Sequence, residues 1–391
     1  MRLLFVLLAV AGVVLPIPGA VRTGAVDRGS IGPAAGGDRK LIALSFDDVP
    51  RGPGAFYTKE QRTIRLIAAL SEADVRQVAF FLNPGRISAG DGAEERIAAY
   101  TAAGHVLADH TFSHRDLSAV TAPAFLADID RSQAWLRGRK GYRPWFRFPG
   151  LNQGGRDTAK RRVVLDGLAA RHLMVAGVTV DGSDWYLDRL AQDAQKAGKS
   201  MNLDGLRDLY VDTMVQSADF SDALMRRSIG RSPAHVLLLH ETDLTTRYLG
   251  ALIDGLRKDG WRIVPADTAF ADPIYHSEPD IPFDNGTVSE AIAWERGITG
   301  PRWYERNDMK VASALFEQRV LGQVAPTRAP AAASAPTPKP DAQTAAARRL
   351  DWLRRVAARH RQCAARRGRA HRLCQELAAS ADRIHLSGTR S

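Results

Sequence analysis

Short apolar runs alternate with longer segments of helical periodicity along most of the chain. Seven of the runs predict strands, at residues 41–46, 78–82, 105–108, 145–148, 172–180, 236–239 and 261–264. The intervening segments space their apolar residues as amphipathic helices do, for example at 59–70, 123–136 and 246–258. Strands that alternate with helices predict a parallel sheet, and the units over residues 40–275 together predict an α/β barrel.

The segments around these units have other patterns. Between residues 185 and 236 lies a long, mostly helical stretch with a predicted helix at 203–227, which we interpret as a helical insertion over 186–235. Such an insertion either covers a substrate cleft and restricts which polymer enters it, or packs on the barrel as an appendage. The other parts are a Gly/Ala-rich lead-in at 21–39, a C-terminal extension at 276–322, an Ala/Pro-rich linker at 323–347 and an Arg-rich helical tail at 348–391.

The first twenty residues have the pattern of a secretory signal peptide. Arg2 is positively charged, residues 3–17 are apolar and uncharged, and Pro18-Gly19-Ala20 provides small residues for cleavage. The apolar run is shorter than the roughly 20 residues that span a bilayer, and a retained membrane anchor is the alternative. We therefore expect an exported protein that is periplasmic, extracellular or envelope-associated, with no transmembrane segment after cleavage.

The net charge is concentrated at one end of the chain. The 391 residues include 54 Lys and Arg against 43 Asp and Glu, a formal net charge of +11. Residues 341–391 contain twelve Arg and four acidic residues, so this tail carries most of the excess. The barrel is nearly balanced, which argues against nucleic acid as its partner. We expect the tail to hold the protein near an anionic envelope surface or an acidic polysaccharide, with a solvated tail as the alternative.

The two cysteines of the chain, Cys363 and Cys374, both lie in this tail. Two cysteines exclude a disulfide scaffold and a structural zinc finger. On one continuous helix the pair would be too far apart to bond, but a turn at residues 366–369 would fold the tail into a helical hairpin. We predict an intramolecular disulfide there, with an intermolecular bond as the alternative.

Titratable side chains follow five of the predicted strands at the carboxyl end. They are Asp47 and Asp48, then Asp109, His110 and His114, then Arg147, then Asp181 and Asp184, and finally His240. In parallel α/β barrels the active site lies at the carboxyl ends of the strands. These side chains are therefore expected to meet in one site.

Two histidines and a carboxylate in this set suggest a metal site. His110 and His114 are four residues apart, which on a helical turn places both imidazoles on one face, although two surface histidines are the alternative. Of the adjacent Asp47 and Asp48, one would bind the metal and the other would act as a base, or both would form a turn or a helix cap. Two histidines and one carboxylate leave positions open for water and substrate, as in catalytic zinc sites.

Five short motifs resemble those of the carbohydrate esterase family 4 polysaccharide deacetylases, also called the NodB homology domain. In order they are Ser-Phe-Asp-Asp-Val-Pro at 45–50, His-Thr-Phe-Ser-His at 110–114, Arg-Phe-Pro-Gly at 147–150, Asp-Gly-Ser-Asp-Trp at 181–185 and Leu-Leu-His at 238–240. Val49 stands where the family usually has Gly, and Gly150 stands where it usually has Tyr. The resemblance covers about residues 40–275 and implies a distorted (β/α)₇ barrel.

The same resemblance implies the activity and the cofactor. It implies removal of acetyl groups from an N-acetylated or O-acetylated polysaccharide such as peptidoglycan, a chitin-like polymer or an exopolysaccharide. It also implies a divalent metal held by Asp48, His110 and His114, for which we expect Zn²⁺, with Co²⁺ or another divalent cation as the alternative. A metal-dependent amidase on a smaller C–N substrate and a carbohydrate-binding protein with a weakly active site are the competing functions.

The resemblance further assigns roles to the other site residues. Asp47 would be the general base, Arg147 would hold it, His240 would be the general acid, and Asp184 would orient a catalytic side chain. The substrate-binding residues would be Trp185 and Leu238, around the acetyl methyl, and Gly150, through its backbone N–H. Core packing is the alternative for Trp185 and Leu238. Asp109 and Asp181 either support the ligands or cap the strand ends.

Overall fold

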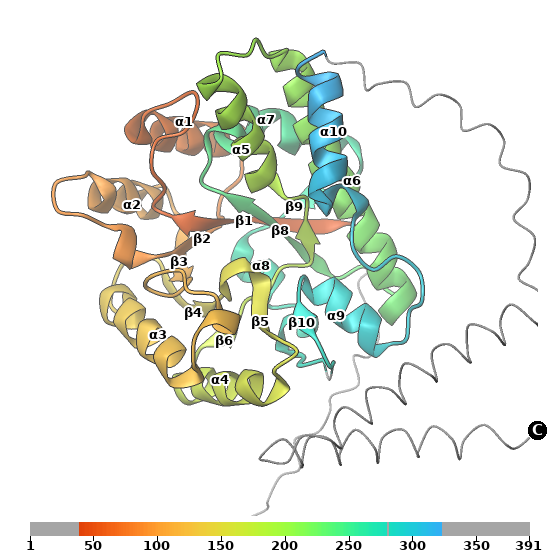
Figure 1. Ribbon diagram of the computed structural model, residues 1–391. Helices are drawn as coiled ribbons and strands as arrows, with labels where there is room; N and C mark the ends of the chain where they lie inside the picture. The colour runs from red at the N-terminus through yellow and green to blue at the C-terminus, as the bar shows by residue number, and fades with distance from the viewer. Residues whose placement is uncertain (1–38, 280, 323–391) are drawn as a thin grey trace, which may run out of the picture. The chain divides into compact units, whose positions relative to one another are not determined.

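The computed structural model describes residues 39–279 and 281–322 (Figure 1). The predicted signal peptide, linker and Arg-rich tail, including Cys363 and Cys374, lie outside these ranges. The lead-in lies outside them too, except for its last residue. These remain predictions.

The described part is built on one parallel sheet. Its strands are β1 (Leu41–Val49), β2 (Ala79–Leu82), β3 (Val106–Asp109), β4 (Tyr142–Phe146), β6 (Met174–Val175), β7 (Val180–Asp181), β8 (Ala234–His240) and β9 (Arg262–Ile263). Their order is β6-β4-β3-β2-β1-β8-β7, and β9 pairs with the start of β1. β1 and β8 are neighbouring interior strands and are buried along almost their whole length, which explains why their sequences are nearly continuous apolar runs.

Helices surround this sheet, which curls into a half-barrel (Figure 1). They are α1 (Lys59–Glu72), α2 (Ala93–Ala102), α3 (Ala122–Leu136), α4 (Thr158–Ala170), α5 (Asp184–Lys196), α6 (Leu203–Ile229), α7 (Asp243–Lys258), α8 (Ala266–Phe270), α9 (Val288–Glu295) and α10 (Met309–Arg319). Their starts are set by the sequence: Thr58 and Gln61, for example, form a reciprocal capping box at α1. The predicted α/β fold, a distorted (β/α)₇ barrel, is confirmed.

The prediction of a single strand at 172–180 is wrong. β6 pairs with β4 and β7 pairs with β8, so the two short strands lie at opposite ends of the strand order. Between them Ala176 and Val178 are fully buried, and the C=O of Ala176 accepts a hydrogen bond from Arg147 Nε. The run is apolar because it packs inside the molecule where the sheet does not close, and hydrophobicity alone cannot separate that situation from a continuous buried strand.

The helical stretch between β7 and β8 forms α5 and α6, and the predicted helix at 203–227 is confirmed with slightly longer bounds. Leu206, Tyr210 and Met214 of α6 share one buried cluster with residues of β1 and β8. This contact makes α6 part of the main core.

The residues after 275 pack against the barrel units. β10 (Asp284–Asn285) pairs antiparallel with β5 (Asn152–Gly155), while α9 packs on α6, and α10 packs on α5 and α6. Short 3₁₀ turns complete the described part: η1 (Pro84–Arg86), η2 (Leu117–Ala119), η3 (Pro149–Leu151), η4 (Pro273–His276) and η5 (Glu305–Asn307). Among the described helices, none has the length and apolarity required to cross a membrane.

Aromatic stacking beneath the site offers a test of this core. Phe80 on β2 is fully buried between the rings of Phe46 and Tyr100, with centroid distances of 5.1 and 4.0 Å. Phe80→Ala removes both contacts and leaves a cavity, so we expect it to lower the free energy of unfolding by about 3–5 kcal/mol. Denaturant unfolding measures this change. Phe283→Ala, at a ring that is 42% exposed, is the matched control, and equal losses in the two variants would contradict the packing described here.

Candidate active site

The polar residues singled out in the sequence lie at the carboxyl ends of neighbouring strands. Asp47 and Asp48 lie just before the last residue of β1, His110 follows β3, and Arg147 follows β4. His240 ends β8, where it is the register partner of Asp47. The parallel topology therefore gathers side chains that are far apart in sequence at one edge of the sheet.

Asp48, His110 and His114 form the one group of three metal-ligating side chains found within residues 39–279 and 281–322. One ligand atom from each residue lies within 4.8 Å of the others. The Oδ1 atom of Asp48 is 2.9 Å from His114 Nε2 and 3.8 Å from His110 Nε2. The distances suit three ligands of a single ion.

Both aspartates face this group because the end of β1 is irregular. In a regular strand Asp47 and Asp48 would point to opposite sides. The β1–β2 pairing shifts register between Phe46 and Val49, and Asp48 has a φ of 70°. As a result Asp47 Oδ2 also approaches His110, at 3.6 Å from Nε2.

The two histidines do not lie on a helical turn, so that part of the prediction is wrong. Residues 110–114 form a loop in which Thr111 and His114 have positive φ values of 65° and 55°. Side chains hold this loop: Asp109 accepts from Thr111 N at 2.8 Å, and Asp128 accepts from Ser113 N at 2.9 Å. These contacts replace the helical hydrogen bonds that the spacing of the histidines had suggested.

Two observations show that the cluster fits a metal ion. Asp48 Oδ1 is buried and accepts no hydrogen bond, although His114 Nε2 is close by. His110 Nδ1 lies 2.9 Å from the carbonyl oxygen of Arg147, so this nitrogen carries the proton and Nε2 presents its lone pair to the cluster. A buried carboxylate oxygen that accepts no hydrogen bond and an imidazole held in the ligating tautomer suit a cation site.

The protonation states agree with metal binding. Burial lowers the pKa of His110 to about 4, so its imidazole is neutral near pH 7. Burial on its own would raise the pKa of Asp48, but the contact with His114 and the positive charge of His240 outweigh it and lower that pKa. Neutral imidazole and ionised carboxylate are the forms that bind metals.

Asp47 forms a buried ion pair with Arg147. The guanidinium of Arg147 donates to Asp47 Oδ1, to Ser45 Oγ at 2.9 Å and to the carbonyl oxygen of Ala176 at 2.9 Å, and it packs 3.6 Å from the centre of the Phe81 ring. Both side chains are almost fully buried. The pair fixes the orientation of the Asp47 carboxylate beside His110.

His240 is paired with Asp184, which begins α5. The Nδ1 atom of His240 donates to Asp184 Oδ1 at 2.7 Å, while Asp184 Oδ2 accepts from His240 N at 2.8 Å and from Thr245 Oγ1 at 2.9 Å. Burial by itself lowers the pKa of His240, but the charge and hydrogen bond of Asp184 outweigh burial and raise it to about 9. The imidazolium stabilises the fold fully below its ordinary pKa of roughly 6.5, and that stabilisation is lost as the pH rises through about 9.

Asp184→Asn tests this pairing. The amide removes the negative charge that raises the pKa of His240, so we expect this pKa to fall from about 9 toward its ordinary value of roughly 6.5. The alkaline limb of the pH–activity profile then moves to lower pH, and NMR titration of His240 reports the same shift. Asp193→Asn, at an exposed position of the same helix, is the control. An unchanged pH–activity profile in Asp184→Asn would contradict the proposed effect of Asp184 on the pKa of His240.

The substrate-contact residues inferred from the resemblance have different surroundings. Gly150 lies in η3 with a φ of 59° and open space where a side chain would be. Trp185 is 37% exposed at the start of α5, whereas Leu238 on β8 is only 5% exposed. Trp185 therefore has the surface to contact a substrate, and Leu238 has much less.

Asp109 and Asp181 act locally at their strand ends. Asp109 is fully buried and accepts from Thr111 N and Gln133 Nε2, and burial raises its pKa to about 7. Asp181 accepts from Ser183 N at 2.7 Å, and burial raises its pKa to about 6. Asp109 thus supports the histidine loop, and Asp181 supports the turn that leads to Asp184.

Three charged residues close to the site were not predicted from the sequence. Arg51 Nη1 donates to Asp48 Oδ2 at 2.7 Å, and Arg86 Nη1 donates to the carbonyl oxygen of Asp48 at 3.0 Å. Glu241 is fully buried and accepts from Arg51 N and Tyr100 OH, both at 2.7 Å. Glu241 directly follows His240, which was a usable signal, whereas nothing in the sequence connects Arg86 with Asp48.

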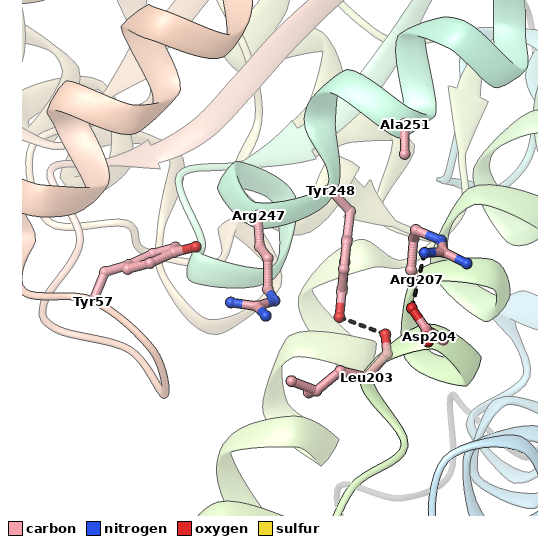
Figure 2. Close-up of a pocket in the computed structure, with 7 residues that line it drawn as sticks. All are labelled: Tyr57, Leu203, Asp204, Arg207, Arg247, Tyr248 and Ala251. Carbon is pink, nitrogen blue, oxygen red and sulfur yellow. Dashed lines mark hydrogen bonds and ion pairs between the residues drawn. The ribbon is translucent and has the colours of Figure 1, made fainter.

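A separate cavity of about 380 Å³ lies between the loop after β1 and helices α6 and α7 (Figure 2). Figure 2 shows Arg247 between Tyr57 and Tyr248, whose hydroxyl donates to the carbonyl oxygen of Leu203 at 2.8 Å. None of the predicted site residues lines this cavity. It is therefore distinct from the candidate active site.

Residues 34–164 match the polysaccharide deacetylase family model. This match spans about a third of the chain; it agrees with the resemblance seen in the motifs and supports a polysaccharide deacetylase as the class of enzyme. The matched segment includes the motifs around Asp48, His110 and Arg147, while those around Asp184 and His240 follow it. None of the curated protein sequences matches the chain significantly.

Several solved structures are similar to this chain at low identity. A family 4 carbohydrate esterase from Streptomyces lividans is 20% identical, with 59% of this chain and 95% of that chain covered and a TM-score of 0.39. The peptidoglycan deacetylase PdaC from Bacillus subtilis is 19% identical, with coverages of 59% and 90% and a TM-score of 0.37. The chitin deacetylase from Colletotrichum lindemuthianum is 19% identical, with coverages of 63% and 92% and a TM-score of 0.43.

Proposed function

We propose that this protein is a metal-dependent hydrolase that removes acetyl groups from an N-acetylated or O-acetylated polysaccharide. The observation that carries the proposal is the convergence of the Asp48–His110–His114 cluster with the Asp47–Arg147 and His240–Asp184 pairs. The match to the polysaccharide deacetylase model supports the same reaction.

Asp48, His110 and His114 would hold the cation, for which Zn²⁺ is our choice because two histidines and a carboxylate suit it. When bound there, the ion supplies Lewis acidity toward the acetyl carbonyl and lowers the pKa of an attacking water. The remaining steps are proton transfers carried out by side chains of this chain.

Asp47 would take the proton from the attacking water. Its carboxylate lies next to His110 and is held by Arg147, so it is in reach of the metal cluster without being a ligand. His240 would give its proton to the leaving amine or alcohol, and Asp184 keeps it protonated near neutral pH. The backbone N–H of Gly150 and the ring of Trp185 would contact the acetyl group.

The proposal is tested with the purified protein stripped of metal and reloaded with Zn²⁺ or Co²⁺. Acetate release is measured from chitooligosaccharide, peptidoglycan and acetylated xylan, together with a small N-acetyl amide. Release from a polymer supports the proposal and identifies the polymer. Release from the small amide alone would favour an amidase, and binding without release would favour a carbohydrate-binding protein. We further propose that the reaction takes place outside the cytoplasm, as residues 1–20 predict.

A further inference from the structure

We propose that the cavity beside Asp48 is a subsite for the carboxylate of an acidic sugar next to the acetylated residue; this inference rests on the proposed function. The cavity measures about 600 Å³, which lies within the usual range of ligand pockets. It lies between the loop after β1, the turn η1 and the start of α2, and Asp48 connects it to the metal cluster.

The charged residues that line the cavity are mostly cationic. They are Asp48, Arg51, Lys59, Arg86, Asp91 and Arg96. Four cations against two carboxylates leave a positive excess, in contrast to the remainder of the site, where carboxylates and histidines dominate. A cleft with an excess of one charge sign concentrates ligands of the opposite sign.

One of the two carboxylates belongs to the metal cluster. Arg51 contacts Asp48 Oδ2 at 2.7 Å, and Arg86 Nη2 lies 3.4 Å from Asp48 Oδ1. A cation held by Asp48 would share the charge of this carboxylate, so the two guanidinium groups would be neutralised less. Loading the site with metal therefore increases the attraction of the cavity for an anion.

Arg96 is a buried cation of this cavity whose contact with an acid is long. Its side chain is buried and lines the cavity, but its Nε and Nη1 atoms make no hydrogen bond. The nearest acid is Glu241, at 3.6 Å, which already accepts hydrogen bonds from Arg51 N and Tyr100 OH. Because this contact is long and Glu241 is already engaged, Arg96 adds to the positive excess of the cavity.

A carboxylate fits this cationic lining better than a neutral hydroxyl does. Guanidinium groups bind carboxylates in two-point geometry, and hydrogen bonds between charged groups are stronger than those between neutral groups. Loss of one such bond weakens binding by about tenfold or more.

The experiment measures binding rather than turnover, so it gives a result even if the deacetylase proposal fails. The full chain carrying Asp47→Asn and loaded with Zn²⁺ is titrated by calorimetry with an N-acetylated oligosaccharide that contains glucuronate, and with its carboxyl-reduced counterpart. We expect the acidic form to bind at least about tenfold more tightly. Equal affinities would overturn the subsite, whereas failure to release acetate in the separate assay would overturn only the proposed function.

Variants locate the effect. Lys59→Gln and Arg86→Gln are expected to reduce the preference for the acidic ligand, whereas Arg86→Lys is expected to retain most of it. Arg76→Gln, at a side chain that is 81% exposed, is the control and is expected to leave the preference unchanged. Metal content is measured for each variant because Arg86 touches Asp48; Lys59→Gln avoids that contact. If neither Lys59→Gln nor Arg86→Gln changes the preference, the assignment to this cavity is wrong. Inorganic phosphate that displaces the acidic sugar at equal concentration would overturn the choice of a carboxylate in favour of a phosphate group.

Discussion

Replacing Asp47 by Asn is expected to abolish most of the deacetylase activity while the protein still binds its metal. The amide cannot accept the proton of the attacking water, and general-base catalysis typically contributes about 10²- to 10⁴-fold to the rate. Asp47 lies 3.6 Å from His110 Nε2 but is outside the three-residue cluster, so metal content should remain that of the wild type. Acetate release and metal analysis of the same preparation measure the two effects.

Asp74→Asn is the matched control for this variant because its side chain is 80% exposed and it is not one of the site residues. Thermal unfolding shows whether Asp47→Asn still folds with Arg147 unpaired in the interior. If folded Asp47→Asn kept the wild-type rate, Asp47 would not be the base. If it lost the metal instead, Asp47 would belong to the ligand set.

The second large effect is expected from His110→Ala, which removes a buried ligand of the proposed metal site. Loss of residues that only support a ligand costs about 10- to 100-fold in metal affinity, so loss of the ligand itself should cost more than about 100-fold. Acetate release should fall to background at stoichiometric Zn²⁺. Metal binding by calorimetry and acetate release by enzymatic assay test the two statements.

His276→Ala is the control, since His276 is exposed at the end of η4 and outside the cluster. His110→Ala also leaves the carbonyl oxygen of Arg147 without its partner, so its stability must be measured alongside. If folded His110→Ala kept full activity and normal metal content, His110 would not be a metal ligand and the proposed metal centre would be wrong.

The fold class and most of the strands could be predicted from the sequence because they depend on local patterns. Apolar runs such as that of β8 predicted the strands, and parallel topology made it possible to infer that the side chains after them would meet. The geometry within the site could not be inferred in this way. The positive φ of Asp48, which turns it toward His110, follows from the register shift between β1 and β2, which only the folded chain shows.

One error and one omission have the same origin. The spacing of His110 and His114 is compatible with a helix, but Asp109 and Asp128 hold the segment as a loop through contacts that the spacing does not reveal. Arg86 is 38 residues away from Asp48 in the sequence. It contacts Asp48 only because the turn that contains Arg86 lies next to the end of β1 in the folded chain. Patterns in sequence report burial and periodicity, whereas these features depend on long-range contacts.

The central claim is that Asp48, His110 and His114 hold one metal ion on which deacetylation depends. Its most direct test is titration of the metal-free protein with Zn²⁺, with bound metal and acetate release measured at each step on whichever acetylated polymer the protein accepts. The account predicts that activity rises with bound metal and levels off at about one ion per chain, and that His110→Ala shows neither effect. Acetate release from metal-free protein, or from His110→Ala at the wild-type rate, would contradict it.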